Sequence, residues 1–152
     1  MPNIDSVPLA ALGDEMSTIT MYLSKGGPAE SDRPEQVEQA VARWDDLIGR
    51  IIAGRALCLG DVRAKLQVVE ALTCGESHIL PDTWRQLFDG ALSTLREIAA
   101  TGDGALKDRA ASALNALEAL DEENFRSWAT EARQLPSARL QRLLSDSYAA
   151  LR

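Results

Sequence analysis

The sequence is poor in the residues that bind transition metals: it holds one histidine, His78, and two cysteines, Cys58 and Cys74. One histidine excludes any site that takes two histidines from the same chain, including a di-iron bundle with paired Glu-x-x-His motifs. Two cysteines without a Cys-x-x-Cys pair are also too few for the disulfide framework of a small secreted domain. We therefore expect no resident metal and no cofactor, and two free thiols in a reducing cytoplasm.

A zinc site and a nucleophilic site remain as alternatives around the same residues. Cys58, Cys74 and His78 could supply three zinc ligands, but the glycine at position 75 disfavours a helix that would bring the last two together. The stretch 75–79 begins like a Gly-x-Ser-x-Gly nucleophile elbow but ends in isoleucine, and no strand precedes it. These patterns give no catalytic residue, so we favour a non-enzymatic protein over an enzyme of unknown type.

Long apolar runs and aromatic side chains are scarce as well. No apolar stretch approaches the ~20 residues of a membrane-spanning helix, and residues 1–5 lack the basic start of a signal peptide. Hydrophobic residues make up 45% of the chain, and most of these are Leu and Ala, whereas aromatic residues make up 5%. This composition disfavours a β-sandwich, because strands favour β-branched and aromatic residues. The sequence therefore predicts a cytoplasmic protein without a membrane segment, folded as one domain over residues 1–152.

What the sequence does contain is the helical period. Apolar residues recur at steps of three and four along almost the whole chain, and no segment alternates as a strand would. We therefore predict an all-α fold, an antiparallel bundle of four helices followed by a long helix and a C-terminal helix. The core bundle is expected over residues 5–104 and a C-terminal hairpin over residues 105–152. The four bundle helices are expected at about 5–24, 34–54, 60–73 and 81–100.

The stretch 105–135 contains neither glycine nor proline and carries the pattern of one long helix. The apolar residues before and after the polar stretch 121–124 fall on the same face of one helix, because Leu117 and Leu135 lie five turns apart. We expect a single helix about 45 Å long at 1.5 Å per residue, in preference to two helices with Asp121 as the second N-cap.

The second expected helix, 34–54, carries small residues on one face, including Ala42, Gly49 and Ala53. A glycine inside a helix costs about 1 kcal/mol relative to alanine, so its presence needs a structural reason. The pattern predicts close backbone contact between this face and a neighbouring helix.

Residues 9–72 combine an early Leu/Met-rich helix, a tryptophan-containing helix and a segment that ends in a Gly-x-x-Ala-Lys-type signature. The residues that carry this combination are Trp44, Ile48, Ile51, Ala64 and Lys65. Asp61 occupies the glycine position of the signature. In these features the chain resembles a group of small, uncharacterised helical bacterial proteins. The resemblance implies a helical fold and a bacterial origin, and it brings no known activity with it.

Charge is distributed unevenly along a chain whose formal net charge is −7. Residues 1–123 hold 11 basic and 21 acidic side chains, whereas residues 124–152 hold five arginines and two acids. The acidic part disfavours binding to nucleic acid or to an anionic membrane, because both carry negative charge. It favours a protein partner with a basic surface.

The C-terminal hairpin carries more apolar surface than four shorter helices would cover, so we expect it to associate with a second copy as a two-fold dimer. The residues expected to take part are Phe125, Trp128, Leu135, Arg139, Arg142, Leu144 and Tyr148. The sequence thus favours a non-enzymatic interaction module, acting as an adaptor, inhibitor or regulator. The alternative is a DNA-associated regulator that binds DNA through Arg139 and Arg142 of the last helix.

Overall fold

The computed structural model describes residues 8–24, 34–73 and 78–152, and within these ranges the chain forms six α-helices and no strand. The helices are α1 (Leu9–Ser24), α2 (Pro34–Ala53), α3 (Leu59–Leu72), α4 (Pro81–Thr101), α5 (Gly104–Glu131) and α6 (Ser137–Leu151). The predicted all-α fold is confirmed, and α2, α3 and α4 begin and end within one residue of their expected bounds. None of the helices in these ranges has the length and apolar character needed to cross a membrane.

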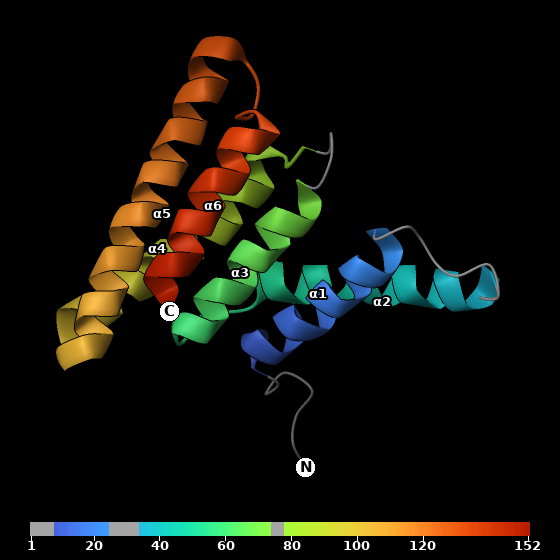
Figure 1. Cartoon of the computed structure of the whole chain (residues 1–152), viewed down its shortest axis with the longest axis horizontal. Helices are drawn as coiled ribbons and strands as arrows, with labels where there is room; N and C mark the ends of the chain where they lie inside the picture. The colour runs from blue at the N-terminus through green and yellow to red at the C-terminus, as the bar shows by residue number, and fades with distance from the viewer. Residues whose placement is uncertain (1–7, 25–33, 74–77) are drawn as a thin grey trace.

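Four helices, α3 to α6, run side by side, while α1 packs along α3 on one side of them and α2 lies across their direction (Figure 1). Within the group of four, α5 contacts α4 and α6, and α6 folds back antiparallel to α5 (Figure 1). The central element is α3, which contacts α1, α2, α4 and α6. The arrangement places the predicted C-terminal hairpin at the opposite side of the molecule from the α1–α2 pair.

The core is centred on α3 because this helix has neighbours around most of its circumference. Its buried apolar residues are spread around the helix instead of forming one stripe, and they include Val62, Ala64, Leu66, Val68 and Val69. A helix that is apolar on several faces suits a position between other helices. Full burial of one such Val or Leu side chain contributes roughly 1.5–3 kcal/mol to folding. Because α3 contacts α1 and α2 as well as α4 and α6, it joins the α1–α2 pair to the rest of the chain.

The long helix α5 is continuous, and the polar stretch 121–124 does not interrupt it, in agreement with the prediction. It ends at Glu131, however, and not at residue 135 as expected. The cause is Ala132, which adopts a left-handed backbone conformation with a φ of 56° and thereby ends the helix and turns the chain. Residues 132–136 form the turn of the hairpin, and α6 begins after Pro136.

The close helix contact predicted for the small-residue face of α2 is not found there. Gly49 is exposed, and a Cβ atom added to it would meet nothing within 4 Å outside its own helix backbone. Close contact occurs instead between α1 and α3, where a Cβ on Gly13 would lie 3.1 Å from the Cα of Ala64 and 2.9 Å from its Cβ. The prediction was wrong because a small residue permits close packing but does not require it.

Candidate functional site in the C-terminal hairpin

Buried amide side chains close the C-terminal hairpin, which consists of α5, the turn 132–136 and α6. Asn124 of α5 is fully buried, and its Oδ1 accepts a hydrogen bond of 2.9 Å from the backbone N–H of Leu135. Gln134 is also buried, and its Oε1 accepts a 2.9 Å bond from the N–H of Ile79, just before α4. Both bonds satisfy buried backbone donors that lie outside any helix, so they hold the turn in one conformation.

Two further residues of the polar stretch 121–124 link α5 to the helices on either side. Asp121 accepts a 2.8 Å hydrogen bond through Oδ1 from Nε1 of Trp84 in α4. Glu123 accepts two hydrogen bonds, of 2.7 and 3.0 Å, from the guanidinium group of Arg139 in α6. The hydrogen bonding to Arg139 lowers the pKa of Glu123. A stretch that looked like an interruption in the sequence therefore organises the hairpin.

The two arginines predicted to take part in binding differ in their surroundings. Both are exposed, but Arg139 is paired with the Glu123 carboxylate, whereas Arg142, one turn away from it on α6, is in none of the salt bridges within the described residues. The negative charge of Glu123 offsets the positive charge of Arg139 and so weakens its attraction for a phosphate. The DNA alternative, which relies on both arginines, therefore gains no support from this geometry.

Trp128, predicted as an association anchor, belongs to an aromatic cluster inside the chain. Its ring packs edge-on against Trp84 of α4, with the ring centroids 5.6 Å apart and the planes at 84°. Trp84 stacks in turn on Phe88, with a centroid distance of 4.2 Å and an angle of 8°. Aromatic pairs contribute about 0.5–1.5 kcal/mol each beyond the burial of their area. Trp128 is consequently half-buried and fastens α5 to α4.

Most of the apolar surface that was predicted to need an outside partner is covered by the chain itself. Leu135 and Leu144 are buried, and Tyr148 is half-buried. The reason is that α6 packs along α5 and also contacts α3, so its apolar stripe faces two helices at once. The sequence analysis overestimated the apolar surface left uncovered on the hairpin, because the sequence does not show that α3 lies within reach of α6.

Phe125 is the apolar site residue that stays outside the core: its side chain is 54% exposed. The guanidinium carbon of Arg85 in α4 lies 5.7 Å from the centroid of its ring, a cation–π distance. Glu122 and Arg126 flank Phe125 on α5 and form an exposed salt bridge of 3.2 Å. We call these four residues the Phe125 face. Sequence reasoning missed Arg85, because only the packing of α4 on α5 brings it to the ring.

A buried charge outside the hairpin has a structural role. Lys65 of α3 is buried, and its Nζ donates hydrogen bonds to backbone carbonyl oxygens at the end of α2. Burial lowers the pKa of Lys65, and the negative charge of Asp61 acts in the opposite direction. One oxygen of Asp61, Oδ2, accepts a 2.8 Å hydrogen bond from the N–H of Leu57. These two residues stabilise the α2–α3 junction.

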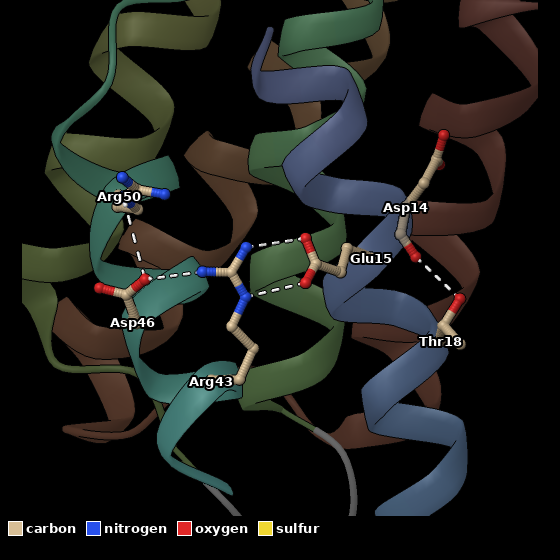
Figure 2. Close-up of polar contacts among 6 residues, drawn as sticks. All are labelled: Asp14, Glu15, Thr18, Arg43, Asp46 and Arg50. Atoms are coloured by element: carbon tan, nitrogen blue, oxygen red, sulfur yellow. Dashed lines mark hydrogen bonds and ion pairs between the residues drawn. The ribbon is translucent and has the colours of Figure 1, made fainter. Parts of the chain in front are cut away.

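Charged side chains also join α1 to α2 (Figure 2). Arg43 of α2 donates hydrogen bonds of 2.8 and 3.0 Å to the carboxylate of Glu15 in α1 and one of 3.2 Å to Asp46. Arg50 approaches the same carboxylate of Asp46 at 3.9 Å. The hydrogen bond from Arg43 lowers the pKa of Glu15. The network lies on the surface, where ion pairs contribute little to stability, and it orients α1 relative to α2.

The zinc and nucleophile alternatives fall partly outside the residues that the structure describes, since Cys74 and positions 75–77 are not among them. Cys58 and His78 are both exposed, the first just before α3 and the second before α4. In the described ranges no three His, Cys, Asp or Glu side chains are grouped so that they could hold a metal ion.

Comparisons of the chain with models of protein families, with curated proteins and with solved structures gave no match. The resemblance of residues 9–72 to small helical bacterial proteins therefore stays a prediction. What the protein does has to be inferred from the geometry of its own side chains.

Proposed function

We propose that this protein is a helical interaction module, acting as an adaptor, inhibitor or regulator, and that it associates with a second copy through the Phe125 face. The observation that carries the proposal is the exposed ring of Phe125 with the guanidinium group of Arg85 against it. Aromatic residues and arginine are enriched in protein interfaces, and a few such residues supply most of the binding energy.

The charges around Phe125 favour a second copy as the occupant of this face. In a two-fold dimer the face meets its own copy, so each positive group needs a negative group at the related position. Glu122 and Arg126, next to Phe125 on α5, provide both signs. In the dimer, Glu122 can pair with Arg126 of the second copy instead of Arg126 of its own chain, and Arg126 can likewise pair with Glu122 of the second copy. The exchange loses little, because an exposed ion pair contributes at most about 1 kcal/mol.

The acidic part of the chain stays accessible in such a dimer. Glu35, Glu38 and Asp45 of α2 are exposed, and α2 lies at the other side of the molecule from the hairpin (Figure 1). Their negative charge would attract a protein partner with a basic surface. We also propose a cytoplasmic location, because two cysteines are too few for the disulfide framework of a small secreted domain.

Sedimentation velocity of the full chain over a range of concentrations tests the proposal. We expect a reversible dimer for the wild type and dimerisation weakened by about tenfold or more for Phe125→Ala. The matched control is Leu106→Ala, which removes another exposed apolar side chain, 45% exposed, from the opposite end of α5. A wild-type chain that stays monomeric up to high micromolar concentration, or an equal effect of both variants, would overturn self-association through this face.

A further inference from the structure

Three arginines from different parts of the chain border one polar groove. The groove has a volume of about 510 Å³ and lies between α1, α3, α5 and α6. Arg63 of α3, Arg109 of α5 and Arg152 after α6 line it. None of the salt bridges within the described part of the chain involves any of these three guanidinium groups. Positive charge is therefore concentrated here, in a protein whose net charge is −7.

Some other arginines of the chain are paired with carboxylates, as Arg43 is with Glu15 and Arg139 with Glu123, whereas Arg55, Arg85 and Arg142 are in none of the salt bridges within the described residues. Three guanidinium groups that border one groove create a positive potential in it, which attracts an anion. One of the three, Arg109, is held in place by a hydrogen bond from its guanidinium group to the backbone carbonyl of Leu151 at the end of α6.

Hydrogen-bond donors line the groove beside the arginines. Gln67 lies one turn after Arg63 on the same face of α3, and its side chain packs against Gly13 of α1. Leu59 and Gly60, the first two residues of α3, also border the groove. The N–H groups of a first helical turn have no acceptor within the helix and carry partial positive charge, which adds to the attraction for an anion.

The hydroxyl group of Tyr148 is a further donor at the groove, and it lies close to the carboxylate of Glu70. It is buried, and it makes no hydrogen bond of standard geometry with the described residues. Burial raises the pKa of Tyr148, and the negative charge of Glu70 and a hydrogen-bonding contact with it raise it further, so the hydroxyl keeps its proton at neutral pH. The hydroxyl can therefore donate to Glu70 or to a ligand oxyanion in the groove.

Glu70 adds an acidic group to the lining of the groove. Glu70 and Tyr148 also line a neighbouring hollow of about 320 Å³ along α6, together with Gln141 and Ser145. The two hollows therefore adjoin at Glu70 and Tyr148, so arginines as well as a carboxylate border the combined space. This combination suits a ligand that carries hydroxyl or amino groups in addition to an anionic group.

We propose that this groove binds a small organic ligand through a phosphate or carboxylate group, held by Arg63 and Arg109. Arginine binds both kinds of oxyanion with paired, charge-assisted hydrogen bonds. The volume of the groove is within the range of small-molecule sites. The groove and the Phe125 face have no residue in common, so the proposed ligand site does not depend on the proposed self-association.

Titration of the isotope-labelled full chain with pyrophosphate and, separately, with citrate, followed by NMR at constant ionic strength, tests the site. We expect saturable shifts of the Leu59 and Gly60 amide signals and of the Arg63 side-chain signal, and the probe that binds more tightly identifies the anionic group. Arg63→Gln should weaken this binding by about tenfold, the loss expected for a charged hydrogen bond. Arg142→Gln, which removes an exposed arginine of α6 outside the groove, should leave it unchanged.

Shifts that do not saturate with either probe would overturn the proposal. An equal loss in Arg63→Gln and Arg142→Gln would overturn it too, because it would show attraction of anions to any surface arginine. Both residues are exposed, so neither substitution should disturb folding, and circular dichroism checks this for each variant.

Discussion

The ammonium group of Lys65 donates a hydrogen bond of 2.7 Å to the backbone carbonyl oxygen of Gly54 and so closes the C-terminal end of α2. A second bond, of 2.9 Å, goes to the carbonyl of Ile51. The last carbonyl groups of a helix lack donors within the helix and carry partial negative charge, so a cation is favourable there. Gly90 of α4 lies against the lysine stem, since a Cβ at that position would be 3.4 Å from Cε. One side chain thus connects α2, α3 and α4.

Replacement of this lysine should be costly. Lys65→Met keeps the length of the side chain but removes its charge and its donors, leaving carbonyl groups of Ile51 and Gly54 without their partner. We expect the free energy of unfolding to fall by about 2–3 kcal/mol, as measured by urea denaturation. The control is Lys107→Met on the surface of α5, which should change stability by less than about 0.5 kcal/mol. Equal stability of the two variants would contradict the capping role of Lys65.

Two glycines of the chain should respond to alanine in opposite directions. Gly49→Ala should stabilise the protein by roughly 0.5–1 kcal/mol, because Gly49 is helical and exposed and a Cβ there meets no neighbour. Gly13→Ala should destabilise it, because the new Cβ would lie 2.9 Å from the Cβ of Ala64 and force α1 away from α3. Thermal unfolding of both variants measures the difference. If both substitutions raised the melting temperature, the close contact of α1 with α3 would be wrong.

The buried amide of Asn124 should be required for the turn of the hairpin. Asn124→Ala removes the acceptor of the Leu135 N–H and leaves a buried donor unsatisfied, so we expect a loss of about 1–3 kcal/mol. Hydrogen exchange of the Leu135 amide should become faster at the same time. Asn115→Ala, at an exposed position of the same helix, serves as the control and should alter neither quantity. Unchanged protection of Leu135 in Asn124→Ala would exclude the proposed bond.

The Glu123–Arg139 pair should make stability depend on pH in the acidic range. The folded-state pKa of Glu123 lies below its ordinary value of 4.5. The pair therefore stabilises the folded state above pH 4.5, and this contribution is lost as the pH falls through the folded-state pKa. Glu123→Gln should be slightly less stable than the wild type at neutral pH, and the difference should vanish in acid. Arg139→Gln should show the same profile in urea denaturation at several pH values. A difference that does not vary with pH would contradict this assignment.

The positions of the helices were predictable because a helix is a local structure. The apolar steps of three and four, the glycines and the prolines placed α2, α3 and α4 within one residue of their observed bounds. The end of α5 was not predictable in the same way. Ala132 has no local reason to adopt a left-handed conformation, and the turn after it depends on Asn124 and on Ile79, which belongs to a distant part of the sequence.

The candidate sites were predictable only in part, for the same reason. Phe125 was identified from the apolar pattern of its own helix, whereas Arg85 is on α4 and reaches the ring only through the packing of two helices. Leu135 and Leu144 have the same pattern as an exposed interface stripe, yet they are buried because α6 also packs on α3.

The order of amino acids alone was enough to establish an all-helical chain, the apolar face of each helix and the absence of an interruption in α5, since these depend on neighbours within a few turns. The tertiary structure alone decided which of these faces are covered, that Lys65 caps another helix, and that Arg63, Arg109 and Arg152 border one groove. Such relations join residues that are far apart in the chain, and they follow from the angles and contacts between helices, which no local pattern encodes.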